Sequence, residues 1–165
     1  MTETIRYKNG EYEGDVVNGN PHGKGKVTYD FGSHGKTVYE GDWVNGEYHG
    51  KGKLTYNNGT ILEGDFVNGK LHGKGKLIEA GHKNTYEGDF VNGKEHGYGK
   101  HTSDEGVFEG EYIKGRRHKG KCTYNDGRVE DGYWKYYKFY GSEVPPEDKP
   151  LESISDEHAH FLSLR

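Results

Sequence analysis

The chain is poor in the residues that build an ordinary globular core. Only 29% of its 165 residues are hydrophobic, and it has one cysteine and four prolines. The single Cys122 excludes an internal disulfide and fits a reducing compartment. No apolar run approaches about 20 residues, the length of a membrane-spanning helix, and no apolar signal segment follows Met1. With a formal net charge of -4, the chain also lacks the basic footprint of nucleic-acid binding proteins. We therefore expect a cytoplasmic protein with no nucleic-acid partner.

Two kinds of residue are plentiful instead. The chain has 28 glycines, and 13% of its residues are aromatic. Low hydrophobicity alone is typical of disordered chains, but disordered segments are also poor in aromatic residues. A thin, extended sheet with little interior reconciles the two observations.

The aromatic residues recur because one segment is repeated along the chain. Residues 39–56 read YEGDWVNGEYHGKGKLTY, similar copies begin at Tyr12, Leu62 and Tyr86, and a degraded copy begins at Phe108. Residues 5–11 resemble the second half of a copy, and residues 129–140 resemble a capping segment. Self-similarity at such a period indicates a repeat architecture. We expect one array over residues 1–140, with about 11–12 strands.

Strand parity gives each copy two different faces. Alternate residues of a strand point to opposite sides, so Tyr39 and Trp43 share one face, while Glu40 and Asp42 share the other. The returning strand adds glycines to the aromatic face and lysines to the acidic face. We expect Asn45-Gly46-Glu47-Tyr48-His49 to form the turn between them, and rings of neighbouring hairpins to lie over the glycine backbone.

The string YEGDxxxGxxHGxGxxxY resembles the MORN repeat, and the resemblance covers residues 5–134. It implies an all-β fold, in which stacked β-hairpins form an elongated, twisted antiparallel sheet. Proteins of this family serve as scaffolds in cytoskeletal, ciliary, axonemal and membrane-associated assemblies, and their enzymes carry the chemistry in another domain. The resemblance therefore implies a non-catalytic scaffold or adaptor for protein–protein interaction.

The histidines raise the question of a metal or a catalytic base. Five of ten occupy one position of the copies, where stacked hairpins separate them by about 9–10 Å, too far for ligands of a shared ion. We expect each to fix turn geometry through a local hydrogen bond, and we see no constellation around His101. Cys122 is expected to be a small buried residue. The sequence thus predicts no catalytic residue, no metal and no cofactor.

Partner binding is the remaining class of function. A groove for a helix or extended segment of a partner protein would be lined by aromatic rings, unless these rings pack only on one another and on glycine. The eight candidates are Tyr12, Tyr39, Trp43, Phe66, Tyr86, Phe90, Phe108 and Tyr112.

Two further partners are kept as alternatives. Anionic phospholipid headgroups would need positive charge, which is concentrated at Arg116, Arg117, Lys119 and Lys121. A homodimer could form through one open end of the array, because end strands present unpaired backbone groups.

The segment after the repeats differs in composition. Residues 141–165 begin with a proline-rich linker, and Leu151, Ile154, His158, Phe161 and Leu162 then follow helical spacing. We predict a short amphipathic helix here, which either caps the last hairpins or helps to recruit a partner.

Overall fold

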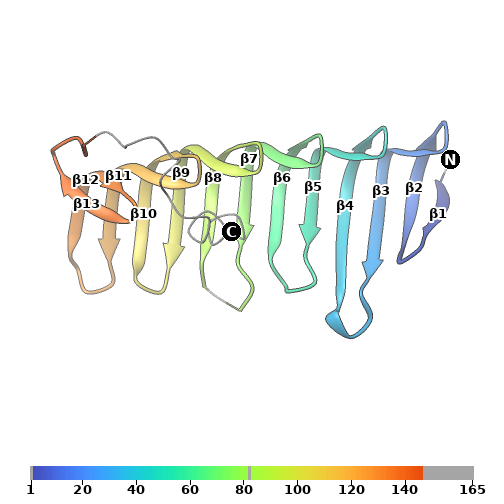
Figure 1. The fold of residues 1–165 in the computed structure, drawn as a ribbon, viewed down its shortest axis with the longest axis horizontal. Coiled ribbons are helices and arrows are strands. Elements are labelled where there is room, and N and C mark those ends of the chain that lie inside the picture. Colours follow the sequence, from blue (N-terminus) through green and yellow to red (C-terminus); the bar gives the residue numbers. More distant parts are fainter. Residues whose placement is uncertain (1, 82, 147–165) are drawn as a thin grey trace.

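The computed structural model describes residues 2–81 and 83–146 and shows one open antiparallel sheet. Its 13 strands follow each other in sequence order, from β1 at the N-terminal end to β13 (Figure 1). The strands are β1 (Thr2–Tyr7), β2 (Gly10–Val17), β3 (Asn20–Asp30), β4 (Lys36–Val44), β5 (Glu47–Thr55), β6 (Ile61–Val67), β7 (Lys70–Ile78), β8 (Thr85–Val91), β9 (Lys94–Ser103), β10 (Gly106–Ile113), β11 (Arg116–Tyr124), β12 (Val129–Lys135) and β13 (Lys138–Gly141). A short 3₁₀ helix, η1 (Gly32–His34), interrupts the connection between β3 and β4.

The all-β prediction is confirmed, and so is the stacking of hairpins. The sheet exceeds the expected 11–12 strands because the aromatic segment after β12 supplies an additional strand, β13. The C-terminal helix, predicted within residues 141–165, falls on residues 147–165, which lie outside the described part of the chain.

Five tight turns close the hairpins of the repeats along one edge of the sheet, the upper edge in Figure 1. A sixth, at Tyr136 and Tyr137, joins β12 to β13. In the first four, an asparagine with φ between 48° and 50° precedes a glycine with φ between 77° and 82°. Two consecutive residues with positive φ make a type I′ turn, whose twist matches that of the flanking strands. In the fifth turn Lys114 replaces asparagine and keeps the same φ of 48°. The turn of the second hairpin is shorter than the expected residues 45–49. Strand β5 begins at Glu47, so Tyr48 and His49 belong to the strand.

A bulge beside each tight turn shifts the register of the hairpin. In the second hairpin the bulge falls between Gly41 and Trp43, so that Asp42 has no opposite residue on β5. The Asp42 carboxylate accepts a hydrogen bond from the Lys51 backbone N–H at 3.0 Å, and it forms an ion pair with Lys24 of the preceding hairpin. Asp89 repeats both contacts with the Tyr98 N–H and Lys74. The acidic residue thus joins its own hairpin to the one before it.

Register pairs confirm that the sheet has two chemically different faces. On the charged face, Glu40 lies opposite both Lys26 and Lys53. The alternation extends from β2 to β12 as a charged ladder of acids and lysines: Glu13, Lys26, Glu40, Lys53, Glu63, Lys76, Glu87, Lys100, Glu109, Lys121 and Asp131. Opposite charges facing each other across strands stabilise by about 0.2–1 kcal/mol per pair, with exposed pairs at the low end.

The other face carries the buried side chains, in two rows. We call the first the middle ladder; the paired positions are Tyr12 with Val27, Tyr39 with Leu54, Leu62 with Leu77, Tyr86 with His101, and Phe108 with Cys122. The second, nearer the tight turns, we call the turn-side ladder; it pairs Val16 with Pro21, Trp43 with Tyr48, Phe66 with Leu71, Phe90 with Glu95, and Tyr112 with Arg117. Apart from Trp134 of β12, the buried core of the protein lies in these two ladders.

Candidate functional site

The aromatic face is held together by rings that meet edge to face. Tyr39 of the middle ladder contacts Trp43 at 5.2 Å and Phe66 of the next hairpin at 5.3 Å between ring centroids. Tyr86 makes the same pair of contacts with Phe90 and with Tyr112. Such pairs stabilise by about 0.5–1.5 kcal/mol beyond the burial of area. Each middle-ladder ring therefore connects two successive hairpins.

Glycine makes room for the middle-ladder rings. A Cβ atom placed on Gly52 would lie 2.2 Å from the Tyr39 hydroxyl oxygen, and one on Gly99 would lie 2.3 Å from the Tyr86 ring. Ring and glycine belong to the same hairpin in both cases, whereas the sequence suggested contact between neighbouring hairpins. The rings that reach a glycine of a neighbouring hairpin belong to the turn-side ladder. For example, Phe90 of β8 would lie 3.0 Å from a Cβ atom placed on Gly75 of β7.

All eight rings predicted to line a groove lie on this face. Their exposed fractions range from 0% for Tyr12, Tyr39 and Phe108 to 6% for Tyr112, so they pack on one another and on glycine. Burial raises the pKa of Tyr39 and Tyr86, and both hydroxyls donate to the backbone carbonyl three residues later, at 2.9 Å. Among the side chains that pair with these rings in the turn-side ladder, Tyr48, Glu95 and Arg117 remain partly exposed. Burial raises the pKa of Tyr48 to about 12.

The repeated histidines lie in the returning strands and bind the next turn. His22 Nδ1 accepts from the backbone N–H of Asn45, His72 Nδ1 from that of Asn92, and His96 Nδ1 from that of Lys114. The last of these is the shortest, at 3.1 Å. The expected local hydrogen bond therefore exists, but it runs from one hairpin to the following one. The five histidines are spread over five strands.

The predicted basic cluster is divided between the two faces. Lys119 and Lys121 lie on the charged face, opposite Glu111 and Glu109. Arg117 belongs to the turn-side ladder, where its guanidinium lies 4.7 Å from the Phe108 ring centroid and 5.5 Å from that of Trp134. Arg116 lies at 4.7 Å from the Tyr136 ring. The four cations therefore do not form one contiguous patch.

The fourth and fifth hairpins differ from the others on the aromatic face. His101 takes the middle-ladder place held by Val27, Leu54 and Leu77 in the first three hairpins. Glu95 and Arg117 take the turn-side places of Pro21, Tyr48 and Leu71. The Arg117 guanidinium lies 3.1 Å from His101 Nδ1. Three polar side chains thus replace apolar ones in two adjacent hairpins.

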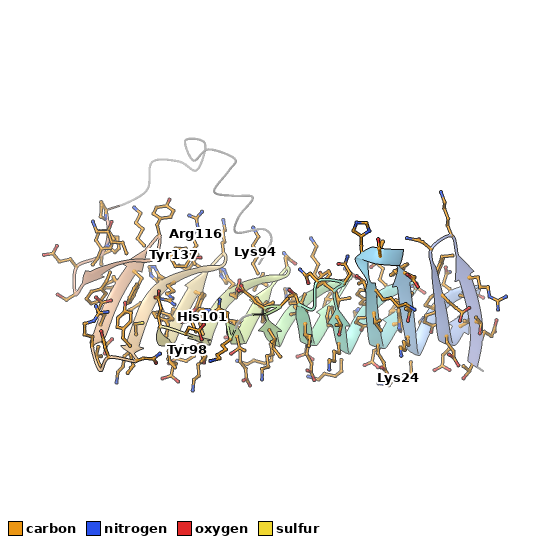
Figure 2. All side chains as sticks on the ribbon, turned by 90° about the horizontal axis from the view of Figure 1, so that it is seen from below. Lys24, Lys94, Tyr98, His101, Arg116 and Tyr137 are labelled. Atoms are coloured by element: carbon orange, nitrogen blue, oxygen red, sulfur yellow. The ribbon has the colours of Figure 1, made fainter. Side chains whose placement is uncertain are left out.

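These side chains surround a cavity of about 40 Å³. It lies near the end of the molecule where Figure 2 labels His101, Arg116 and Tyr137. Its lining residues come from β7 to β11 and from the segments beside them: Leu77, Glu79, Asn84, Thr85, Tyr86, Glu95, His101, Tyr112, Gly115, Arg117 and Tyr137. Asn84 Nδ2 donates to the Glu79 carboxylate at 3.1 Å.

The Tyr112 hydroxyl is exceptional in this cavity. It is buried and has no hydrogen-bond partner among residues 2–81 and 83–146. Phe66 and Phe90, at the same ladder position, carry no hydroxyl, and the indole N–H of Trp43 donates to the Gly25 carbonyl. Burial raises the pKa of Tyr112, and the neighbouring Arg117 opposes that rise. Leaving a buried polar group unsatisfied costs about 1–3 kcal/mol.

Sequence reasoning missed this cavity and treated His101 as isolated. The signal was nevertheless present in the aligned copies. Reading down one column gives Pro21, Tyr48, Leu71, Glu95 and Arg117, and the change from apolar to charged residues marks the place.

The comparisons with known proteins agree with the repeats and add boundaries. The MORN repeat family matches five segments, residues 12–32, 39–61, 63–78, 86–107 and 108–127. The starts agree with those read from the sequence, except that the third begins one residue later. A comparison with curated proteins found no match. In the described part of the chain, no helix is long and apolar enough to cross a membrane. The matched segments cover more than half of the chain, which therefore belongs to the MORN repeat family.

Proposed function

We propose that the protein is a non-catalytic scaffold that holds a helical or extended segment of a partner protein along its aromatic face. The observation that carries the proposal is that residues 2–81 and 83–146 form no second layer over this face. Among the described residues, each strand packs chiefly against its neighbours in the same sheet. Repeat proteins commonly bind partners on such extended surfaces.

Contact with the partner falls to the partly exposed side chains of the turn-side ladder, because the eight predicted rings are almost fully buried. Tyr48 stacks on Tyr39 at 3.7 Å between ring centroids and keeps a partly exposed edge. An aromatic ring supplies contact area with little loss of conformational freedom, which favours it as an anchor for a partner. The buried rings hold these anchors in place.

A peptide-display selection against the purified protein tests the proposal. Peptides that bind through the aromatic face should lose at least about tenfold in affinity, or about 1.4 kcal/mol, with Tyr48→Ala. The matched control is Tyr98→Ala, because Tyr98 is exposed on the charged face and lies on the opposite side in Figure 2 from Tyr137 and Lys94.

Two results would contradict the proposal. One is a set of peptides that bind both variants equally, and the other is a selection that yields no binder. Flotation with phosphoinositide vesicles tests the anionic-lipid alternative in parallel. Flotation that is lost with Arg116→Ala would favour the lipid reading instead.

A further inference from the structure

The polar changes on the aromatic face converge instead of being scattered. His101 lies on β9 of the fourth hairpin, and Arg117 lies on β11 of the fifth. Both line the same cavity as Glu95 and the buried Tyr112 hydroxyl. A buried polar atom without a partner is rare in folded proteins and calls for an explanation, such as an absent ligand.

The charge of the lining favours a cation. A guanidinium can only donate hydrogen bonds, so the His101 Nδ1 that faces Arg117 must accept, and the ring carries no proton there. Arg117 is then the one cationic side chain in the lining, while Glu79 and Glu95 supply two carboxylates. The side chains that line the cavity therefore carry one more negative charge than positive charge.

The shape and the rings favour a small cation. A volume of about 40 Å³ is enough for two or three water-sized groups, which suits an ammonium with its last methylene better than a guanidinium. Tyr86, Tyr112 and Tyr137 line the cavity, and tyrosine faces attract cations within about 6 Å. An ammonium donates three hydrogen bonds and accepts none, so a carboxylate and a phenol oxygen are suitable acceptors for it.

We propose that this cavity binds the ammonium group of a lysine side chain on the partner segment, with Glu95 and the Tyr112 oxygen as its acceptors. The idea rests on the proposed function for the origin of the lysine, but the chemistry of the cavity can be tested without a partner.

A lysine anchor would give the docked segment a direction. Leu71 and Glu95 occupy equivalent places in successive hairpins, about 9–10 Å apart for two strand spacings. A partner segment with an apolar residue near Leu71 would place its lysine at Glu95 when it runs one way. If the segment ran in the opposite direction, its lysine would lie against the apolar second hairpin, beside Tyr48 and Leu54.

The experiment is a nuclear magnetic resonance titration of the full chain with small probes. Nα-acetyl-lysine N-methylamide is compared with the norleucine analogue, which lacks only the ammonium, and with the glutamate analogue. The Gly115 backbone amide is the reporter, since it donates to the Glu95 carbonyl at 2.7 Å. We expect saturable shifts with the lysine probe at millimolar concentration and at least about tenfold weaker binding of both analogues.

Variants locate the binding and separate it from folding defects. Glu95→Gln keeps the shape of the side chain and should weaken the lysine probe at least about tenfold. Tyr112→Phe, which restores the residue type of the third and fourth hairpins, should weaken it severalfold. Glu47→Gln is the control, because Glu47 is exposed beside the second turn and remote from the cavity.

Equal binding of the norleucine probe, or stronger binding of the glutamate probe, would overturn the proposal. So would lysine binding that both Glu95→Gln and Tyr112→Phe leave unchanged. These results are separate from the peptide selection: display peptides that bind through Tyr48 but contain no preferred lysine would support the scaffold and refute the lysine site.

Discussion

The first three hairpins and the next two share a backbone but differ in what they offer a ligand. In both regions a type I′ turn, a bulge and a glycine beneath the ring fix the geometry. The ladder partners change. In the turn-side ladder Pro21, Tyr48 and Leu71 give way to Glu95 and Arg117, and in the middle ladder His101 replaces an apolar residue. A bulge persists in the fifth hairpin, although there Glu111 replaces the usual aspartate and pairs with Lys119, and His118 is the residue without an opposite partner. Specificity in this array can therefore change without disturbing the fold.

The largest expected effect on stability comes from placing a carboxylate in the third hairpin, at the position that Glu95 occupies in the fourth. Leu71 is 1% exposed, so Leu71→Glu loses its burial and places a carboxylate in apolar surroundings. We expect the free energy of unfolding to fall by at least about 3 kcal/mol. The reverse change, Glu95→Leu, reproduces the third hairpin and should alter it by less than about 1 kcal/mol. Urea denaturation of the two variants measures both values, and similar values for the two would remove the distinction between the regions.

A smaller effect on the free energy of unfolding is expected from removing the hydroxyl of Tyr112 or of Tyr86, and the two changes should have opposite signs. Tyr112→Phe removes a buried hydroxyl without a partner among the described residues, so it should raise the free energy of unfolding by about 1 kcal/mol. Tyr86→Phe removes a hydroxyl that donates to the Asp89 carbonyl, so it should lower that free energy by about 1 kcal/mol. Thermal or urea unfolding gives the sign directly. A loss of stability in Tyr112→Phe would mean that its hydroxyl is satisfied in solution.

The smallest effect concerns pH and the acidic residue of the bulge. The ion pair with Lys24, followed by the Lys51 N–H, lowers the pKa of Asp42 in the folded protein below its ordinary value of 3.8. A lowered folded-state pKa stabilises the protein fully above the ordinary value, and this contribution is lost as the pH falls through the folded value.

We therefore expect Asp42→Asn to lower the free energy of unfolding at pH 7 by about 0.5–1 kcal/mol, a modest amount because the Lys24 partner is largely exposed. The difference from the wild type should shrink as the pH falls below 3.8. Glu111→Gln is the matched variant in the fifth hairpin, where no ion pair of Glu111 is found in the described part of the chain, and it should change little. Urea denaturation at pH 7, 5 and 3 checks the trend, and a gap that widens in acid would contradict it.

Strand parity predicted much of this structure because alternation is a local property. The pairing of Glu40 with lysines, the burial of Tyr39 and Trp43, and the placement of Cys122 on the aromatic face followed from it, and the structure confirms them. The bulge at Asp42 was not predictable in this way, since it depends on a carboxylate that reaches a backbone N–H nine residues later.

The cavity depends on longer-range contacts. Arg117 and His101 come from strands β11 and β9, which flank β10 on its two sides. Their side chains meet because the bulge turns Arg117 toward the aromatic face, where His101 lies. Parity alone left Arg117 grouped with Lys119 and Lys121. The pattern of a single copy contains no information about contacts between copies, so the site required either the fold or a column-by-column reading of all five.

The order of the strands also determines how the array would carry force. Its interstrand hydrogen bonds run along the length of the molecule, because the strands lie across that length in sequence order (Figure 1). A pull between the two ends therefore loads every strand pair in series, and no pair shares the load of another. The tensile strength of the whole scaffold is then that of its weakest pair, however many repeats it contains.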